Sequence, residues 1–425
     1  MRLLKNGHLV DPEAGIDGVR DLLLDGDRVA EVAADIPAAG HDVLDLGGRV
    51  VCPGFLDMHV HLREPGFEED ETIASGTLAA VAGGFTAVAC MPNTRPVNDD
   101  QSVTDFIVAE AGRTGACRVH PIAAITRKSG GEELTEFGDL VESGAVGFSD
   151  DGRPVSSGLV MRRAMEYSLL FDVPIIDHCE DLCLADDGVM NEGAVSTELG
   201  LRGHHTVAEE MHVVRDLLLA ELTGARVHLA HVSTARAVEM VRQAKARGVR
   251  CTAEATPHHL FLTEDSVRGY DTRFKMKPPL RSEADRLALV AGLVDGTIDA
   301  VATDHAPHHP DKKKVEFSLA PFGVVGLETA VSLLLDRLVR PGTLDLPRLV
   351  RALSVAPRRI LGCPRGTLAP GSPADITVLD LEAACTVDAE RFRSLSRNTP
   401  FGGWQLRGMP CRTIVAGEDR FVAGS

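Results

Sequence analysis

Two histidines separated by a single residue, His59 and His61, form the first pattern in this sequence that could do chemistry. They lie at the end of an apolar run that begins near Val51. In a strand, side chains two residues apart point to the same face, so both imidazoles would enter one space. Such a pair can share a metal ion, although it is also common as a structural feature. The spacing therefore raises a metal-binding hypothesis that needs further ligands.

Four more residues extend this pattern to six candidate ligands. One comes from each of four later segments: a histidine from Ile175–Glu180 and from His228–Ser233, and a carboxylate from Phe148–Gly152 and from Ala302–Pro307. Imidazole and carboxylate groups suit zinc or a similar divalent ion. Any one of these residues could simply form hydrogen bonds at the end of a strand. Together, in equivalent places, they indicate a metal centre.

The number of ligands bears on the number of metal ions. Six ligands are too many for one tetrahedral zinc ion, but they suit two ions about 3.5–4 Å apart that share one carboxylate and one hydroxide. Metal ions lower the pKa of bound water toward about 7, which makes a hydroxide nucleophile available near neutral pH. One carboxylate must then handle the proton. The residue types therefore favour hydrolytic chemistry at two divalent ions.

These side chains can meet only if the elements that carry them end on one face. Amphipathic helices are predicted at Ala208–Leu222, Ala235–Arg247 and Glu283–Leu293. About eight β/α units predict a (β/α)8 TIM-type barrel, whose strands open onto one catalytic face. The eight predicted strands are Val51–His59, Phe85–Met91, Arg118–Ile125, Ala145–Phe148, Pro174–Asp177, Arg226–Ala230, Arg250–Ala255 and Asp299–Ala302.

Both ends of the chain carry a different pattern. Asp21–Ala30 alternates around an Asp-Gly turn, and strand signals return in Gly366–Leu379 and Thr413–Ala416. This pattern predicts a small β-sandwich domain built from both chain ends. The predicted boundaries are 1–51 for its N-terminal part, 52–364 for the metal-dependent catalytic barrel and 365–425 for its C-terminal part.

Composition excludes several kinds of partner. The chain has 425 residues, of which 44% are hydrophobic and 25% charged, as in ordinary globular proteins. Its formal net charge of −18 repels phosphate backbones and anionic lipids, so we expect neither nucleic acid nor membrane partners. No apolar run reaches about 18 residues. The nine cysteines lack paired spacing, and we expect them to be reduced in a cytoplasmic protein.

Five segments resemble the amidohydrolase superfamily, and specifically the class I dihydroorotases of bacteria. The likeness extends nearly from end to end, whereas the His-x-His pair alone would indicate only the superfamily. It implies the reversible cyclisation of N-carbamoyl-L-aspartate to L-dihydroorotate in de novo pyrimidine (UMP) biosynthesis. The segments are Asp57–Gly66 (DMHVHLREPG), Met91–Thr94 (MPNT), Phe148–Gly152 (FSDDG), Ala302–Pro307 (ATDHAP) and Ala320–Gly326 (APFGVVG).

The resemblance also implies a role for each candidate ligand. In the hydrolytic direction a metal-bridging hydroxide would attack the ring amide carbonyl. Asp304 would take the hydroxide proton and pass it to the leaving nitrogen, as the catalytic residue. Zinc is the predicted metal. The implied ligands are His59, His61 and Asp304 for the first ion, His178 and His231 for the second, and Asp151 as the bridge between them.

The substrate carries a carboxylate, which requires a cationic, preferably forked, partner. Arg63 lies two residues beyond His61, on the same face if the strand continues, and it is similar to the carboxylate-binding Arg of the family. The other substrate contacts implied by the resemblance are His61, Asn93, His308 and the backbone groups of Phe322 and Gly323.

Lys277 is the visible departure from the family pattern. Close bacterial relatives usually have Asn at this position, which contacts the substrate, so the contact is in question here. We expect Lys277 on the loop beyond the seventh strand, on the catalytic face. Two other histidine pairs are interpreted as structural: His204-His205 at the start of a helix, and His258-His259 on a loop, where one could orient a ligand.

Two alternatives stay open. Hydantoinases, dihydropyrimidinases and allantoinases resemble this sequence too, but they bridge their metals with a carboxylated Lys after a Phe. Here Ser149 follows Phe148, and serine cannot form a carbamate. The other alternative is an inactive dihydroorotase-like scaffold for aspartate transcarbamoylase, although such proteins have lost metal ligands. We predict a homodimer that acts on a small molecule, and association with aspartate transcarbamoylase is possible.

Overall fold

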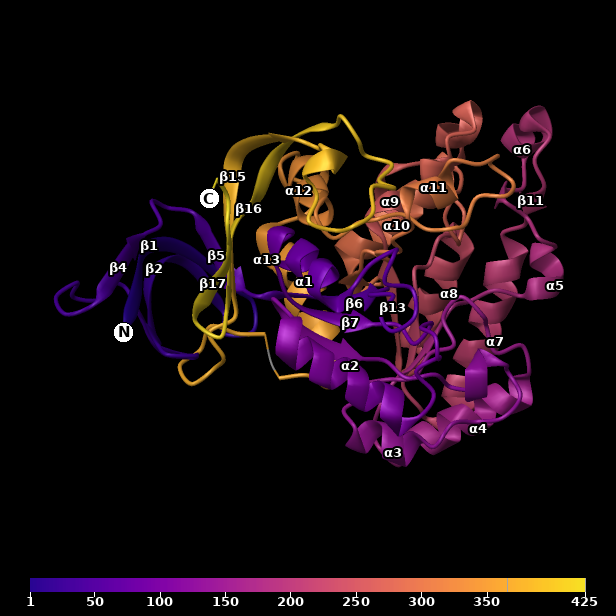
Figure 1. Ribbon diagram of the computed structural model, residues 1–425, viewed down its shortest axis with the longest axis horizontal. Helices are drawn as coiled ribbons and strands as arrows, with labels where there is room; N and C mark the ends of the chain where they lie inside the picture. Colours follow the sequence, from indigo (N-terminus) through magenta and orange to yellow (C-terminus); the bar gives the residue numbers. More distant parts are fainter. Residues whose placement is uncertain (365, 425) are drawn as a thin grey trace.

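The fold combines a sheet built from both ends of the chain with parallel strands from its middle (Figure 1). This computed structural model describes residues 1–364 and 366–424, and it confirms the predicted α/β class. Residues 365 and 425, which bound the predicted C-terminal part, lie outside the described residues. The strands of the terminal sheet are β1 (Arg2–Asp11), β2 (Ile16–Asp25), β3 (Arg28–Ala33), β4 (Asp42–Asp45), β5 (Val50–Pro53), β15 (Ile376–Thr386), β16 (Gln405–Val415) and β17 (Glu418–Val422).

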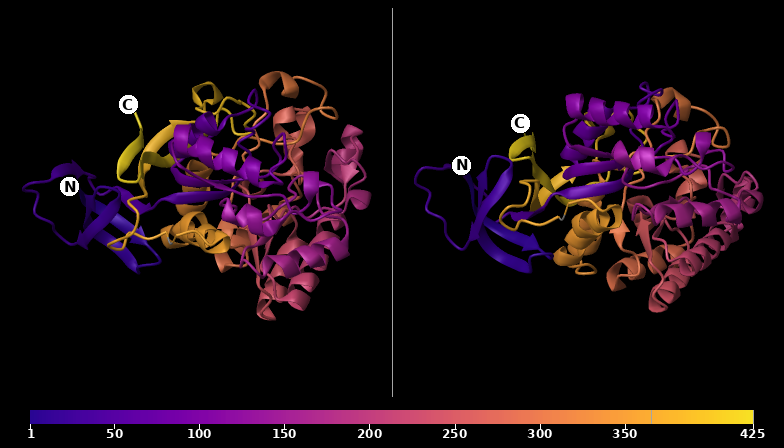
Figure 2. Two further views of the ribbon diagram at one scale, coloured as in Figure 1. Left: turned by 60° about the horizontal axis from the view of Figure 1, so that its bottom comes forward. Right: turned by 90° about the horizontal axis from the view of Figure 1, so that it is seen from below.

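The two chain ends meet where β5 lies between β1 and β15. The strand order is β17-β16-β15-β5-β1-β2-β3, and β4 pairs with β1. Apolar side chains from both ends, such as Leu22 and Ile376, share one buried cluster. In both views of Figure 2 these strands lie at one end of the molecule, away from most of the helices. β17 was not predicted.

The predicted first strand, Val51–His59, is wrong as a single element. The chain bends at Gly54, and β6 (Phe55–Val60) begins a separate parallel sheet with β7 (Phe85–Cys90). A Cβ atom at Gly54 would lie only 2.1 Å from Thr86 Oγ1, so a larger residue does not fit there. Two residues inside the predicted barrel range, Cys52 and Pro53, consequently pair with the terminal sheet.

The parallel strands form two short sheets, in the orders β6-β7-β8 and β14-β13-β12-β9. The predicted strand Ala145–Phe148 between them is wrong as a regular strand, because only Phe148 is bridged to both sides, to Ala123 and Ile175. On the other side of the sheets, His305 is bridged to Val60. The remaining parallel strands are β8 (Arg118–Pro121), β9 (Ile175–Asp177), β12 (Val227–Leu229), β13 (Cys251–Ala255) and β14 (Ala300–Val301).

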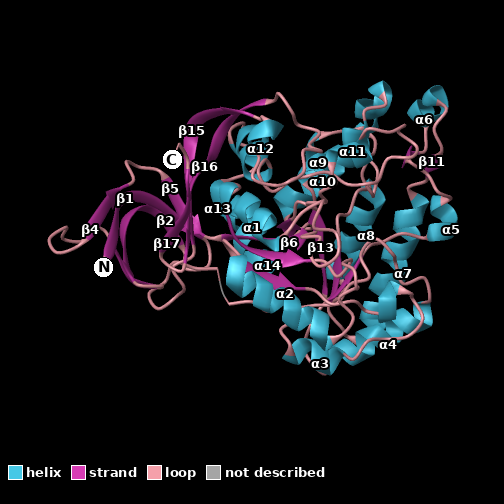
Figure 3. Ribbon diagram, in the orientation of Figure 1, coloured by secondary structure: helices cyan, strands magenta, loops and turns pink. Residues whose placement is uncertain are grey.

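Helices surround the parallel strands (Figure 3). The three predicted helices are confirmed as α7 (Val207–Thr223), α8 (Ala235–Ala246) and α10 (Glu283–Asp295). Thr234 and Ser282 cap the last two, because their side chains accept hydrogen bonds from backbone N–H groups of the first turn.

The other helices are short or lie closer to the terminal sheet. Among the described residues, no helix is long and apolar enough to cross a membrane. The helices not named so far are α1 (Ile73–Ala82), α2 (Gln101–Thr114), α3 (Phe137–Glu142), α4 (Gly158–Ser168), α5 (Leu182–Ala185), α6 (Ala194–Leu199), α9 (Pro257–Phe261), α11 (Pro310–Lys313), α12 (Ala330–Leu334), α13 (Leu346–Val350) and α14 (Ala356–Leu361). A small strand pair consists of β10 (Met190–Asn191) and β11 (Gly203–His204).

Candidate metal centre and substrate site

The structure brings all six candidate ligands together at the ends of the parallel strands. They are all buried. Their arrangement forms two groups of potential ligand atoms that share Asp151. The first group is His59, His61 and Asp151, and the second is Asp151, His178 and His231. Asp304 joins the first group through its Oδ1 atom, which lies 3.0 Å from His61 Nε2.

The distances converge on Asp151. Its Oδ1 atom lies 3.4 Å from His59 Nε2, 3.5 Å from His178 Nδ1 and 3.6 Å from His231 Nε2. Among the described residues, neither His59 Nε2 nor Asp151 Oδ1 has a hydrogen-bond partner, although both are buried. Buried polar atoms without partners are costly, and a divalent cation between them would remove that cost. The residues present therefore fit a centre for divalent metal ions.

The backbone at two strand ends is unusual. His231 and Asp304 have φ values of 32° and 48°, a left-handed conformation that non-glycine residues rarely adopt. The Asp57 carboxylate accepts hydrogen bonds from Thr303 N at 3.1 and 3.2 Å, which ties β6 to the segment carrying Asp304. Burial raises the pKa of Asp57 to about 7. These contacts hold Asp304 beside His59 and His61.

Glu254 in β13 is a functional candidate that the sequence analysis missed. Its Oε1 atom lies 2.7 Å from His59 Nδ1 and accepts a hydrogen bond from His231 N at 3.2 Å. Burial alone would raise the pKa of Glu254, but the neighbouring imidazoles of His59 and His228 hold it below its ordinary value. A carboxylate behind a ligating imidazole orients the ring and fixes its tautomer. The signal was a charged residue inside the otherwise uncharged strand Cys251–Ala255.

Asn93 and His61 lie next to one another, as a shared substrate site would require. His61 Nδ1 lies 2.9 Å from Asn93 Oδ1, so the imidazole can donate to the amide oxygen. An open cavity of about 370 Å³ reaches Asn93 and Asp151 from the surface. Its other lining residues include Phe67, Arg95 and Lys128. The cavity therefore leads from the surface to Asp151, one of the six candidate ligands.

Arg63 reaches the site for a different reason from the one predicted. β6 ends at Val60, and Arg63 has a φ of 65°, so the strand does not continue through it. The turn lets Arg63 Nε donate to Pro307 O at 3.1 Å, close to Asp304 in sequence. Within the described part of the chain, no carboxylate lies within ion-pair distance of Arg63. Its guanidinium group is thus available to an anion.

The other predicted substrate contacts already have partners within the protein. His308 Nε2 lies 2.7 Å from Phe322 O, and Gly323 N donates to Lys275 O at 3.0 Å. Burial, together with the charge of Arg63, lowers the pKa of His308 to about 3. His308 is therefore neutral near pH 7, so its Nε2 can carry the proton that Phe322 O accepts.

Of the four histidines in the remaining pairs, all but His205 lie in short elements. His204 belongs to β11, so the predicted helix start applies only to His205, whose Nδ1 accepts from Val207 N. His258 and His259 lie in the short helix α9 rather than on a loop, because Thr256 caps a turn that begins at Pro257.

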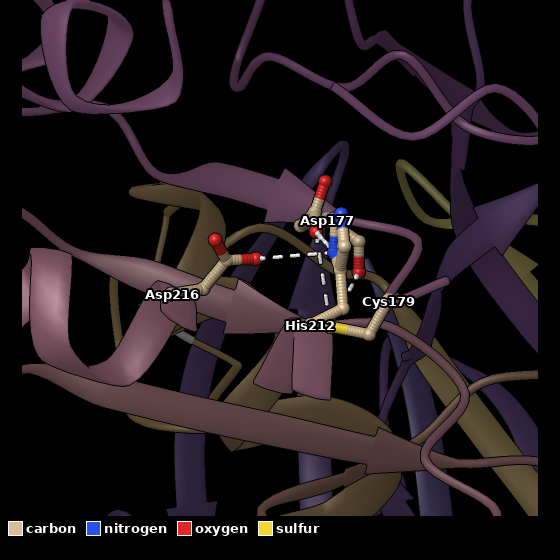
Figure 4. Close-up of side chains that lie close together, drawn as sticks. All are labelled: Asp177, Cys179, His212 and Asp216. Carbon is tan, nitrogen blue, oxygen red and sulfur yellow. Dashed lines mark hydrogen bonds and ion pairs between the residues drawn. The ribbon is translucent and has the colours of Figure 1, made fainter. Parts of the chain in front are cut away.

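A second buried cluster lies directly behind β9. Figure 4 shows Asp177, Cys179, His212 and Asp216 gathered there, with His212 Nδ1 2.8 Å from Asp177 Oδ2. This cluster already contains a cation, because Arg215 Nη2 lies 2.7 Å from Asp216 Oδ1 and 3.7 Å from Asp177 Oδ2. We interpret it as a network that holds α7 against β9.

Several known proteins with sequences similar to this chain share one name. The family described as Dihydro-orotase-like matches residues 48–237. A dihydroorotase of Syntrophotalea carbinolica is 54% identical over 416 residues, which is 98% of each chain. A dihydroorotase of Pelotomaculum thermopropionicum is 55% identical over 424 residues, or 99% of each chain.

Solved structures support the same class. An L-hydantoinase (dihydropyrimidinase) from Arthrobacter aurescens superposes with a TM-score of 0.88 at 26% identity, covering 98% of this chain and 95% of that one. A dihydropyrimidinase from Brevibacillus agri shares the fold, with a TM-score of 0.84 at 21% identity over 98% of this chain and 94% of that one. Fold, clustered ligands and relatives together define a cyclic amidohydrolase. Within that class, the chain belongs to the dihydroorotase family, as its motifs predicted.

Proposed function

We propose that this protein catalyses the reversible cyclisation of N-carbamoyl-L-aspartate to L-dihydroorotate, with two zinc ions. The observation that carries this proposal is the pair of ligand groups that share Asp151. Relatives more than half identical over almost the whole chain are named dihydroorotases. The first ion would be held by His59, His61 and Asp304, the second by His178 and His231, and both by Asp151.

When bound, ions of this kind activate water and polarise a carbonyl oxygen. The family resemblance assigns the proton to Asp304, whose carboxylate is buried at the strand end, 3.0 Å from His61 Nε2. In the hydrolytic direction it accepts a proton at a carboxylate oxygen and returns it to the ring nitrogen that leaves. Glu254 keeps His59 in one orientation, because it accepts from Nδ1 and leaves Nε2 facing the centre.

Arg63 and Asn93 bind the substrate in this proposal. The Arg63 guanidinium has no carboxylate partner among the described residues and can pair with the substrate carboxylate in a forked geometry. Asn93 accepts from His61 through Oδ1, so its amide N–H groups remain to donate to the substrate. His308 stands next to Pro307, whose carbonyl holds Arg63. These groups favour an acidic ring over an uncharged one.

Two features of the architecture also belong to the proposal. We propose that the parallel strands close into one (β/α)8 barrel that begins at Phe55, the first residue of β6, rather than at residue 52, and extends to residue 364, with the single bridges at Phe148 and His305 joining the two sheets. The terminal sheet would fold over its own apolar cluster as a β-sandwich, which the shared packing of Leu22 with Ile376 supports. Homodimerisation and association with aspartate transcarbamoylase rest on the resemblance alone, and sedimentation with and without that enzyme tests both.

The deciding experiment follows absorbance near 230 nm with dihydroorotate, dihydrouracil and hydantoin, alongside metal analysis of the same sample. We expect turnover of dihydroorotate to exceed that of the uncharged rings by several orders of magnitude, because a half-buried guanidinium left without an anionic partner is costly. Arg63→Met should remove most of this preference. Efficient turnover of dihydrouracil by the unmodified protein would instead support the hydantoinase alternative.

A further inference from the structure

Two side chains, Glu180 and then Lys277, lie behind the candidate metal ligand His178. Lys277 Nζ lies 2.7 Å from Glu180 Oε2, and the same oxygen lies 3.5 Å from His178 Nε2. The other oxygen of Glu180 lies 2.9 Å from His204 Nε2. Glu180 is almost fully buried, at 2% side-chain exposure, whereas Lys277 is 26% exposed. Lys277 comes from the loop between β13 and β14, so these contacts join two distant parts of the chain.

The two ring nitrogens of His178 face different partners. Nδ1 points to the candidate centre, at 2.9 Å from His231 Nε2 and 3.5 Å from Asp151 Oδ1. A neutral imidazole that binds a metal through Nδ1 must carry its proton on Nε2. Glu180 Oε2 is the acceptor in reach of that proton. Carboxylates in this position orient the imidazole and raise its basicity as a ligand.

Glu180 in turn needs a counter-ion, because a buried carboxylate without one is strongly destabilised. Lys277 supplies that charge, and its ammonium lies 5.6 Å from the centre of the Phe322 ring, which flanks it. The neutral Asn that the family resemblance implies at this position could not supply it. Removing the charge would favour a Glu180 side chain that turns toward solvent, away from its present position 3.5 Å from His178 Nε2.

We propose that Lys277 is a positioning residue for the metal centre, acting through Glu180 on His178 rather than contacting the substrate. This inference rests on the metal centre of the proposed function. By this inference, Lys277 in place of the family's Asn changes how the metal ligand His178 is held in position. The zinc ion held by His178 should therefore respond to Lys277, while the affinity for dihydroorotate should not.

The test compares Lys277→Met, Lys277→Arg, Glu180→Gln and the double variant Lys277→Met/Glu180→Gln. Zinc-loaded protein is mixed with a chromophoric chelator, and the rate of zinc release is recorded without substrate. KM and kcat for dihydroorotate are measured separately. Lys245→Met is the matched control, because Lys245 is similarly exposed at 24% and pairs with Asp299 at 2.6 Å, on α8 rather than beside His178.

We expect Glu180→Gln to speed zinc release by about tenfold or more, the range for residues that hydrogen-bond to metal ligands. Lys277→Met, one contact further away, should speed it about three- to tenfold, and Lys277→Arg should restore it to within about twofold. In the double variant the Lys277 change should add nothing to the Glu180 change. KM should stay within about threefold of the unmodified protein in Lys277→Met.

Either of two results would overturn the inference. One is a KM raised tenfold or more in Lys277→Met with unchanged zinc release, which would make Lys277 a substrate contact. The other is a Lys277 effect on zinc release that persists in full in the Glu180→Gln background. The single Lys277 variants decide the first point even if Glu180→Gln fails to fold. Zinc content and turnover of the unmodified protein, measured first, report on the proposed function alone.

Discussion

Two buried clusters of histidine and carboxylate lie on either side of the end of β9, and they differ in one respect. His178 belongs to the candidate metal centre. Its neighbours Asp177 and Cys179 belong to the second buried cluster, with His212 and Asp216 of α7, which we call the α7 cluster. Alternate residues of an extended chain face opposite sides, which separates them. Arg215 places a permanent cation in the α7 cluster. Within the described residues, the metal centre has no such cation between its ligands.

The two clusters show that residue types and burial alone do not define a metal site. In the α7 cluster, Arg215 already compensates the carboxylates of Asp177 and Asp216. In the metal centre, buried atoms such as His59 Nε2 and Asp151 Oδ1 converge without partners among the described residues. A divalent ion is favoured where buried anionic groups lack another counter-charge.

The largest effect is expected from Asp151→Ala. Asp151 belongs to both ligand groups, so its loss should leave at most one zinc ion per chain and no measurable turnover of dihydroorotate. Metal analysis after gel filtration, with circular dichroism to show that the variant is folded, checks this. Retention of two ions would show that Asp151 is not the ligand shared by the two ions.

Asp304→Asn tests whether a carboxylate of the candidate metal centre also transfers a proton, besides holding an ion. The amide cannot take up and return a proton, so turnover per bound zinc should fall by about 10²- to 10⁴-fold, the usual range for proton-transfer catalysis. The measurement is the rate at saturating dihydroorotate divided by zinc content. Near-normal activity on that basis would assign the proton to another group.

Arg215→Met removes the cation from the α7 cluster. Two buried carboxylates would lose their partner, and the free energy of unfolding should fall by about 3 kcal/mol. Denaturant unfolding measures this loss, with Arg242→Met as a control on an exposed ion pair. Uptake of a third zinc ion by Arg215→Met would show directly that the guanidinium excludes metal. A third zinc ion in the unmodified protein would contradict our interpretation of this cluster.

Cys179→Ser should have the smallest effect. The thiol lies 3.8 Å from Asp177 Oδ2 and makes only weak contacts, so stability should change by about 1 kcal/mol or less. Zinc content should stay at two ions per chain. Loss of one ion from this variant, with the fold intact, would mean that the α7 cluster binds metal after all.

Much of the candidate site could be read from local patterns. His59 and His61 share a face because of strand alternation, and Asp151 and Asp304 follow apolar segments that end on one side. The helices α7, α8 and α10 follow from amphipathic periodicity and their caps. The strand at Ala145–Phe148 could not be judged locally, because only Phe148 forms β-bridges and its partners, Ala123 and Ile175, come from elsewhere in the chain.

The sequence by itself determined the family, the six candidate ligands and the α/β class, because these depend on residue identity and short-range spacing. Only the tertiary structure decided which buried polar groups support them. Glu254 meets His59 across 195 residues, and Lys277 meets Glu180 from another loop. The tertiary structure also decided that Arg63 reaches the site through a turn rather than along a strand. Such contacts join residues far apart in the chain, and their energies depend on distances that local patterns do not contain.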